Sequence, residues 1–283
     1  MNNAPVIIEE SFLKPMHRHF INLTCLVSGD YAKTKNNGMP AFYNISAFIV
    51  EVDNRWFAIT AGHIFEKLKE AQNEGVKISN WKIDDSIVSH NSAHPYPIPL
   101  DIDRDVLYLS DDVPGMDYAC FEIGNLARQA LSEQGIQAIS SGIWSADDMP
   151  KYSKWILIGT PESGVVFDFN KPTRKLHVTI MLKPVPVNEI PADLIKEYGR
   201  CYASLDRSSI GSTDNQFDIE GMSGGPIFGL KPTTQPNSSH YEYRIIGIQS
   251  GWYKSSDHIA FCAAQPFIET LEQCIKKVPN SLG

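Results

Sequence analysis

Short apolar segments, many with polar residues at alternate positions, recur along the whole chain. They are rich in Val, Ile, Phe and Thr and lie at residues 24–29, 45–52, 56–60, 118–123, 154–159, 176–182 and 244–250. Clusters of turn-forming residues, such as VDNR at 52–55 and KPTR at 171–174, separate them. Segments of this length and composition, bounded by such clusters, are typical of β-strands. The pattern therefore predicts a protein built mainly from β-strands.

Helical periodicity is confined to three segments, at residues 64–72, 124–135 and 266–278. The last has the best pattern, because apolar residues recur every four positions and two lysines lie at its end, where the helix dipole favours positive charge. Residues 193–200 give a weaker indication of a short fourth helix. We therefore expect a β protein with few helices, one of them near the C-terminus.

The composition is that of a globular protein with a large core. Of the 283 residues, 42% are hydrophobic and 10% are aromatic. This is enough to fill one large domain or two closely packed small ones. The chain contains no internal repeat, low-complexity tract or linker-like stretch. We expect one compact unit over residues 1–283.

Charge and cysteine usage argue against several classes of protein. The formal net charge is −8 and the 25 Lys and Arg residues are scattered, so we expect no nucleic-acid binding. No apolar run is long enough for a membrane span, and the first 15 residues lack the pattern of a secretory signal. The five cysteines, an odd number without a C-x-x-C pair, fit neither a disulfide framework nor a zinc site. These features predict a cytoplasmic protein with no membrane partner, metal or cofactor.

The strongest chemical signal is the stretch GMSGGPIFGL at residues 221–230. A serine hydroxyl is a weak nucleophile at neutral pH, so Ser223 needs a base, and the base needs a carboxylate that orients it. His63 ends the apolar run FAITAGH, and Asp117 directly precedes the apolar run YACFEI. Taken singly, such a histidine is usually a packed or solvated residue and such an aspartate a turn former. Together the three are a candidate base, orienting acid and nucleophile.

The same stretch also matches G-x-S-x-G, the nucleophile turn of α/β-hydrolases. That turn follows an apolar strand, precedes a helix, and has its acid and histidine later in the chain. Here the polar run STDNQFDIE at 212–220 comes first, and a strand-like stretch from Pro226 follows. The downstream candidates Asp257 and His258 are adjacent rather than spaced. This context nearly excludes the α/β-hydrolase interpretation.

The blocks TAGHIF, DYACFEI and GMSGGPIFG, in this order, resemble the three signature blocks of trypsin-like serine peptidases of the chymotrypsin fold, in a bacterial intracellular form. The resemblance covers roughly residues 20–278, although only the three blocks are specific. It implies an all-β fold of two packed six-stranded antiparallel Greek-key β-barrels followed by a C-terminal helix. The implied barrels span about 20–145, with His63 and Asp117, and about 150–263, with Ser223, and the helix spans 264–278.

The resemblance implies a serine endopeptidase acting on intracellular protein or peptide substrates. Ser223 attacks the peptide carbonyl, His63 accepts and returns the proton, and Asp117 orients the imidazole. The backbone N–H groups of Gly221 and Ser223 form the oxyanion hole. Met222 stands where secreted members carry the aspartate that pairs with a freed N-terminus, so we expect no activation switch of that kind.

Residues that bind substrate follow from the same alignment. Ser250, Gly251 and Trp252 are predicted to form an extended edge along the substrate. Phe217, or Asp218 after a shift of one residue, stands at the position of the acid that binds Lys or Arg in trypsin-type enzymes. Ile259 is predicted to lie near the floor of the specificity pocket. Trp252 replaces a residue that is commonly glycine in the family. Together these favour a small or apolar side chain on the acyl side of the cut.

Two other functions use the same residues. In the first, the chain is a binding or sensor module of protease fold that is inactive or waits for an activating protein partner before its oxyanion loop forms. In the second, the chain is an esterase with the same triad. Labelling with a fluorophosphonate distinguishes the enzymes from the inactive module, and peptide and ester substrates distinguish the two activities.

Overall fold

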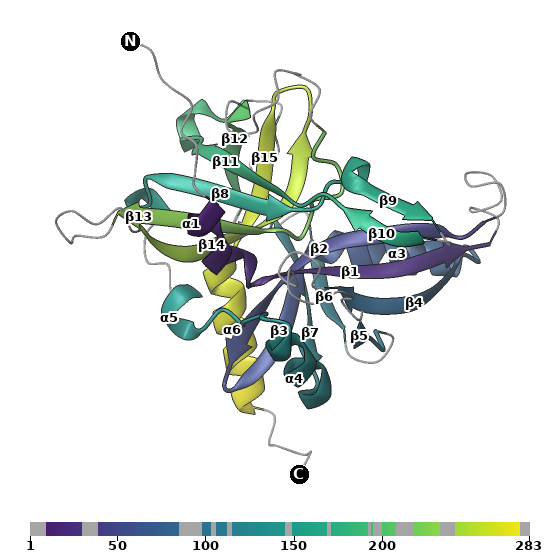
Figure 1. Ribbon diagram of the computed structural model, residues 1–283. Coiled ribbons are helices and arrows are strands. Elements are labelled where there is room, and N and C mark those ends of the chain that lie inside the picture. The colour runs from purple at the N-terminus through teal and green to yellow at the C-terminus, as the bar shows by residue number, and fades with distance from the viewer. Residues whose placement is uncertain are drawn as a thin grey trace.

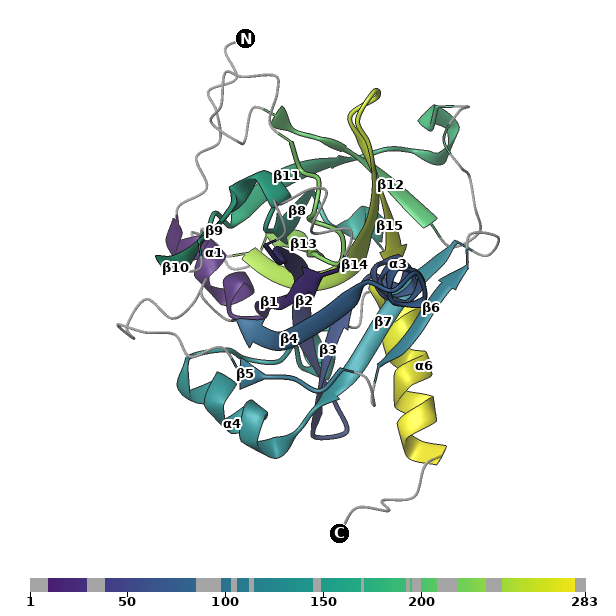
Figure 2. The same ribbon diagram turned by 90° about the vertical axis from the view of Figure 1, so that its right-hand side faces the viewer.

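The computed structural model describes residues 10–29, 39–84, 98–102, 106–111, 115–144, 149–168, 171–191, 194, 200–207, 218–232 and 241–277. Within them the chain forms an open β-sheet and a closed β-barrel that pack against each other (Figure 1). A helix, α6 (Ala264–Lys277), lies near the C-terminal end and runs beside the open sheet (Figure 2). The prediction of a mainly β protein with a C-terminal helix is confirmed.

The open sheet contains seven antiparallel strands in the order β5-β4-β1-β2-β3-β7-β6. Their bounds are β1 (Phe20–Ser28), β2 (Ala41–Val52), β3 (Arg55–Thr60), β4 (Lys77–Asp84), β5 (Ile98–Pro99), β6 (Leu107–Asp111) and β7 (Met116–Ile123). One face buries an apolar cluster that includes Ile21, Ile49 and Phe121. The helices α3 (Gly62–Asn73) and α4 (Asn125–Glu133) follow β3 and β7, close to the predicted segments 64–72 and 124–135.

The sequence-based expectation of a closed six-stranded barrel in this half differs from the structure. Among the strands that the structure describes, no pairing joins β5 to β6, so the sheet stays open. The edge strand β5 has only two residues, and one of them is Pro99, which has no N–H to donate to a further strand. A short edge strand that contains proline ends the ladder there.

The second half is a closed antiparallel barrel of six strands, as predicted. The order is β11-β12-β15-β14-β13-β8. The bounds are β8 (Lys154–Gly159), β11 (Val178–Pro184), β12 (Arg200–Leu205), β13 (Pro226–Pro232), β14 (Tyr241–Tyr253) and β15 (His258–Ala263). Its interior holds an apolar cluster that includes Leu157, Ile180, Met222 and Phe261. A separate hairpin of β9 (Val165–Asp168) and β10 (Lys171–Lys175) stands outside the barrel.

The remaining elements are short. They are α1 (Glu10–His17), α5 (Ser141–Trp144) and the 3-10 turns η1 (Met149–Lys151), η2 (Glu162–Gly164) and η3 (Val187–Glu189). Helix α1 was not predicted, because Pro15 interrupts its pattern. The weak helix expected at 193–200 lies mostly outside the described residues, and Arg200 begins β12. None of the helices in the described parts of the chain is long and apolar enough to cross a membrane.

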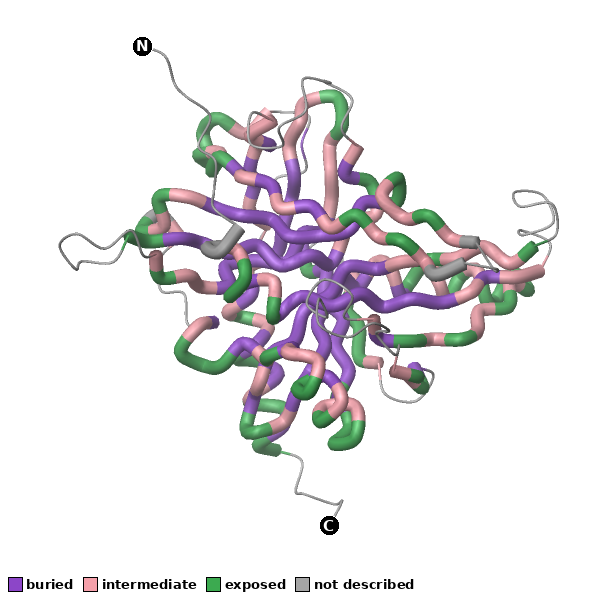
Figure 3. Tube along the Cα trace, viewed as in Figure 1, coloured by how far each residue is buried: buried purple, intermediate pink, exposed green. Residues whose placement is uncertain are grey.

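The two halves share an interface that is buried and partly polar, which we call the seam. Figure 3 shows buried segments of both halves meeting at the centre of the molecule. A mixed apolar cluster there includes Phe48 from the sheet and Phe228 from the barrel. The N–H of Thr160 donates to Ser46 Oγ at 3.0 Å, across the seam. The sheet ends at Ile123 and the barrel begins at Lys154, and the domain boundary between them, like the boundary at 263, stays a prediction.

Candidate active site

His63 and Asp117 lie together at one edge of the seam. His63 is the second residue of α3, and Asp117 is the second residue of β7. His63 Nδ1 lies 2.7 Å from Asp117 Oδ2. The backbone N–H of His63 donates to Asp117 Oδ1, also at 2.7 Å. The Asp117 side chain is 3% exposed and that of His63 is 24% exposed, so a buried carboxylate orients an imidazole whose other edge reaches the surface.

The start of β7, which carries Asp117, is held by contacts from the barrel half. Tyr118 Oη donates to the carbonyl oxygen of Ala263 at 2.9 Å, and its ring stacks on Phe267 of α6 at 4.6 Å between centroids. Cys262 Sγ donates to the carbonyl oxygen of Gly115 at 3.2 Å. Burial, together with the Asp117 charge, raises the pKa of the Cys262 thiol to about 12. This cysteine is therefore a neutral donor and not a nucleophile at neutral pH.

Ser223 lies in two consecutive turns that connect residues 218–219 to β13. The N–H of Met222 donates to the carbonyl oxygen of Ile219 at 3.1 Å, and that of Gly225 donates to the carbonyl oxygen of Met222 at 3.0 Å. The side chain of Met222 is fully buried in the barrel core. This apolar anchor, rather than an ion pair, fixes the turn that presents Ser223.

The backbone N–H groups of Gly221 and Ser223 have no hydrogen-bond acceptor among the described residues, whereas Met222 and Gly224 between and after them are both bonded. Gly221 has φ +89°, and a Cβ at this position would lie 2.8 Å from the backbone N of Glu162. Only glycine fits this backbone without displacing the adjoining turn. Two N–H groups two residues apart that have no acceptor within the described ranges, at a turn that requires glycine, are what an oxyanion hole requires.

The serine turn packs against the strand end that leads to His63. A Cβ at Gly224 would lie 1.9 Å from Thr60 Oγ1 and 2.4 Å from the carbonyl oxygen of Ser46. Thr60 ends β3, three residues before His63. The structure therefore brings Ser223 to the same part of the seam as His63 and Asp117. Between these described residues, no hydrogen bond joins Ser223 to His63.

The predicted edge residues Ser250, Gly251 and Trp252 lie on β14. Pairing of β14 with β13 ends at the Ile248–Pro226 pair, while pairing with β15 continues to Tyr253. Beyond Gln249, whose carbonyl oxygen accepts from Gly224 N at 2.8 Å, no described strand pairs with the second edge of β14. This open edge beside the serine turn can accept an extended peptide.

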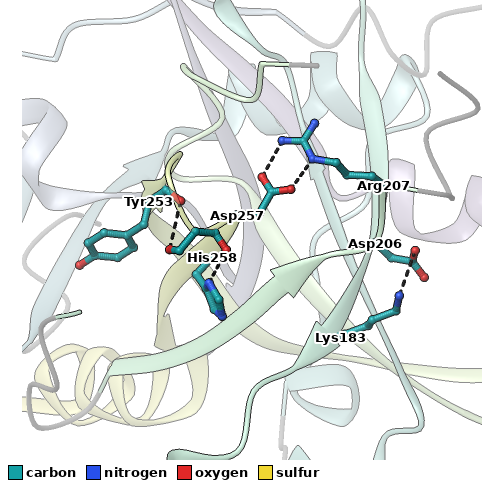
Figure 4. Close-up of polar contacts among 7 residues, drawn as sticks. Lys183, Asp206, Arg207, Tyr253, Asp257 and His258 are labelled. Carbon is teal, nitrogen blue, oxygen red and sulfur yellow. Dashed lines mark hydrogen bonds and ion pairs between the residues drawn. The ribbon is translucent and has the colours of Figure 1, made fainter. Parts of the chain in front are cut away.

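The turn that joins β14 to β15 is tightly held, as the polar contacts in Figure 4 show. Arg207 pairs with the carboxylate of Asp257 through two nitrogens, and the carbonyl oxygen of Asp257 accepts from Leu205 N at 3.1 Å. His258 Nδ1 lies 2.6 Å from the carbonyl oxygen of Ser256. These bonds fix the hairpin that carries the open edge.

The predicted pocket residues have different positions. Ile259 pairs with Trp252 across β14 and β15 and is fully buried in the barrel core, against which the indole of Trp252 packs. Asp218 is half-buried, pairs with Lys254 Nζ at 2.8 Å and accepts from Glu220 N at 2.8 Å. Burial alone would raise the pKa of Asp218, but these two bonds outweigh it and lower the pKa. Phe217 lies outside the described residues.

Lys254 was not identified from the sequence, although it contacts two of the predicted substrate-binding residues. Its ammonium group pairs with Asp218 and lies 5.3 Å from the centre of the Trp252 ring. Asp218 also lines a shallow depression of about 270 Å³ together with Glu162, Ser163 and Glu220. Trp252 lies near the end of β14 and Lys254 begins the turn after it, and their separation by two positions was the only sequence signal for this contact.

No cluster of three or more His, Cys, Asp or Glu side chains within the described ranges could hold a metal ion. The five cysteines are all free thiols. The arrangement of a histidine, a carboxylate and a serine beside two free N–H groups can support acid–base and nucleophilic chemistry by side chains alone.

Comparisons with known proteins give structural similarity only. No protein-family model matches the chain, and no curated protein matches its sequence. Among solved structures, the protease Anisep from Arthrobacter nicotinovorans is 16% identical, with 89% of this chain and 93% of that chain covered and a TM-score of 0.47. The thermostable serine protease AL20 from an extremophilic microorganism is 15% identical, with coverage of 93% and 99% and a TM-score of 0.48. Similarity at this level does not assign an activity to the chain.

Proposed function

We propose that the chain is a serine endopeptidase that cleaves peptide bonds through Ser223, His63 and Asp117. The observation that carries the proposal is the buried pair of Asp117 and His63, at 2.7 Å, together with a glycine-rich turn in which the N–H groups of Gly221 and Ser223 have no acceptor among the described residues. A paired imidazole, a serine and two unused donors are the parts that acyl transfer needs.

In the proposed mechanism, His63 Nε2 removes the proton of Ser223 Oγ while Oγ bonds to the substrate carbonyl carbon. The N–H groups of Gly221 and Ser223 stabilise the oxyanion that forms. His63 then gives the proton to the leaving nitrogen, and the C–N bond breaks. Water attacks the acyl-enzyme, His63 takes its proton and returns it to Ser223 Oγ. Asp117 keeps the imidazole in the required tautomer throughout.

The proposed substrate is an extended protein or peptide segment. It adds as a strand to the open edge of β14 at Ser250, Gly251 and Trp252. The bulk of Trp252 and the buried Ile259 support a small or apolar side chain on the acyl side of the cut. The pairing of Asp218 with Lys254 supports the same preference, because this carboxylate already has a cation.

We also propose that the protein acts in the cytoplasm and uses no cofactor. Five free thiols, three of them buried, support a reducing compartment. Fractionation of cells that produce the protein, followed by detection of the chain in the cytosolic, membrane and external fractions, tests this location. Recovery outside the cytosol contradicts it.

One observation favours a second candidate function, a binding or sensor module that a protein partner activates. No hydrogen bond joins Ser223 to His63 between their described positions, so the proposed nucleophile is not bonded to its proposed base. Catalytic hydrogen bonds often tighten only when substrate binds, so this spacing is also compatible with an active enzyme.

A fluorophosphonate probe distinguishes the two functions. An active serine peptidase becomes labelled at Ser223, and neither Ser223→Ala nor His63→Ala reacts at a comparable rate. Ser132→Ala, on the exposed face of α4, is the matched serine substitution and should label like the wild type. Absence of labelling in the wild type contradicts the enzyme, and labelling that appears only after addition of cell extract supports the partner-activated module.

A further inference from the structure

The β9–β10 hairpin belongs to the barrel half of the chain but lies against the open sheet. In Figure 1 it lies beside β1 and β2, outside the barrel. Phe167 of β9 stacks on Phe42 of β2, with 4.7 Å between ring centroids and 11° between ring planes. The hairpin therefore spans the seam and has an aromatic contact with the sheet.

An ion pair also joins the same hairpin to the sheet. Lys175 Nζ at the end of β10 lies 2.5 Å from Asp84 Oδ2 at the end of β4. The two side chains are 2% and 15% exposed. Lys175 Nζ also lies 6.0 Å from the centre of the Phe42 ring. Of the ion pairs between described residues, this one joins the two halves and has the most buried side chains, and removal of either partner takes a nearby opposite charge away from the other.

The base of the hairpin contacts the oxyanion loop. The N–H of Leu176, next to Lys175, donates to the carbonyl oxygen of Gly164 at 2.8 Å and closes the hairpin at the turn η2. The first residue of η2, Glu162, donates its N–H to the carbonyl oxygen of Glu220 at 2.7 Å. The backbone N of Glu162 is also the atom that a Cβ added at Gly221 would meet first, at 2.8 Å. The hairpin is thus linked to the Glu220–Gly221 peptide through two hydrogen bonds, one at each end of η2.

We propose that the ion pair of Lys175 and Asp84 is a positioning device for the oxyanion hole. It anchors the hairpin to the sheet, the hairpin fixes η2, and η2 holds the Glu220–Gly221 peptide in the orientation that points the Gly221 N–H at the substrate. The oxyanion hole therefore forms only when the two halves are joined at this pair. The inference rests on the proposed function, because a positioned N–H matters only if Ser223 reacts.

The chemistry predicts how the pair affects the reaction. A displaced oxyanion donor weakens binding of the transition state and leaves binding of the substrate unchanged. Loss of the ion pair should lower kcat while KM stays the same, and the orientation of His63 by Asp117, which lies on other elements, should not change. A pair that only stabilises the fold would lower the melting temperature and leave kcat of the folded protein as it is.

The test compares fluorophosphonate labelling rates and peptide kinetics at a temperature at which every variant is folded. Lys175→Met and Asp84→Asn should each label at least about tenfold more slowly than wild type. The controls are Arg55→Met, which removes an ion pair inside the open sheet, and Leu131→Ala, which lowers stability through the core below α4. Both controls should stay within about twofold of the wild type, and Lys175→Arg should restore most of the rate because it keeps the pair.

Each result supports or overturns the inference. If Lys175→Met does not fold, Asp84→Asn decides, since the amide keeps the shape of the carboxylate. Wild-type rates in Lys175→Met or Asp84→Asn, with a lowered melting temperature, overturn the positioning role while the proposed function stands. If the Leu131→Ala control also reacts slowly, the effect is one of stability, and the positioning role is overturned as well. If the wild type is not labelled, whereas the fold is intact, the proposed function fails and the inference fails with it.

Discussion

The carboxylate of Asp117 accepts two hydrogen bonds from the single residue His63, one from its backbone N–H and one from its ring Nδ1, each at 2.7 Å. The backbone N–H belongs to the first turn of α3, where N–H groups have no partner inside the helix. One buried carboxylate therefore both satisfies the start of the helix and orients the imidazole that the helix carries.

This double role makes Asp117→Asn a test of chemistry and stability at once. The amide favours the wrong imidazole tautomer, so kcat should fall by about 10⁴-fold, and the loss of charge-assisted bonds should lower the free energy of unfolding by about 1–3 kcal/mol. Peptide hydrolysis and urea unfolding measure the two effects. Glu122→Gln, on the exposed face of the same strand, is the matched control, and equal rates in both variants would contradict the assignment of Asp117.

Gly221→Ala should lower catalysis through the backbone. Alanine is strained at φ +89°, and its Cβ would lie 2.8 Å from the backbone N of Glu162, so the turn must shift. Loss of one oxyanion donor costs about 10²- to 10³-fold in kcat. Steady-state kinetics measure this loss. Gly142→Ala in α5, where no atom lies within 4 Å of the added Cβ, should keep wild-type kinetics, and unchanged kcat in Gly221→Ala would remove the proposed oxyanion role.

Stability should fall as the pH drops from about 6.5 to about 4, because of His19. Burial lowers the pKa of His19 to about 4, although the hydrogen bond of its Nδ1 to the carbonyl oxygen of Gln137, at 2.7 Å, raises the pKa in part. Between the folded and unfolded pKa values, the unfolded chain binds the proton and the folded chain does not, so protonation favours unfolding. The difference corresponds to about 3 kcal/mol, fully present above pH 6.5 and lost at pH 4.

Urea unfolding at pH 4.5, 5.5 and 7.5 measures this dependence on His19. The variant His19→Gln keeps polar atoms at the ring position but has no group that titrates in this range. It should therefore flatten the pH profile of the free energy of unfolding below pH 6.5. An equal slope in wild type and His19→Gln would show that other groups cause the acid sensitivity.

The rate of thiol modification should be higher for one exposed cysteine than for three buried ones. Burial raises the pKa values of Cys25, Cys120 and Cys262 to about 12, whereas Cys274 on α6 is exposed. Only a thiolate reacts with iodoacetamide, so Cys274 should be modified first in the folded protein at pH 8. Mass spectrometry after a short reaction measures the order. Cys274→Ser should remove the fast phase, and rapid modification of a buried thiol would contradict the packing around these three cysteines.

Local pattern was sufficient to predict the helices that follow β3 and β7 and seven strands, namely β1, β2, β3, β7, β8, β11 and β14, but not β4 or β12, which also contribute to the two cores. Alternation and helical spacing report on burial within one segment, so segments such as 154–159 and 56–60 could be identified without knowledge of their neighbours. The helix at 266–278 could be located for the same reason, since its apolar face packs on the seam.

Contacts between distant segments could not be predicted in this way. Lys175 and Asp84 are 91 positions apart, and the pattern of polar and apolar residues around either one gives no indication of the other. The closure of a sheet is a similar property, because it depends on whether β5 and β6 meet and not on the pattern of either strand. Met222 is the intermediate case: its place next to Ser223 was evident, and its burial in the barrel core became clear only from the fold.

The residues of the candidate site are divided between the two halves of the molecule. His63 and Asp117 belong to the sheet, while Ser223 and the open edge of β14 belong to the barrel. Neither half contains all three residues. If the proposed function holds, the catalytic rate depends on how closely the two halves are docked, and a small shift between them would stop the reaction while both cores remain intact.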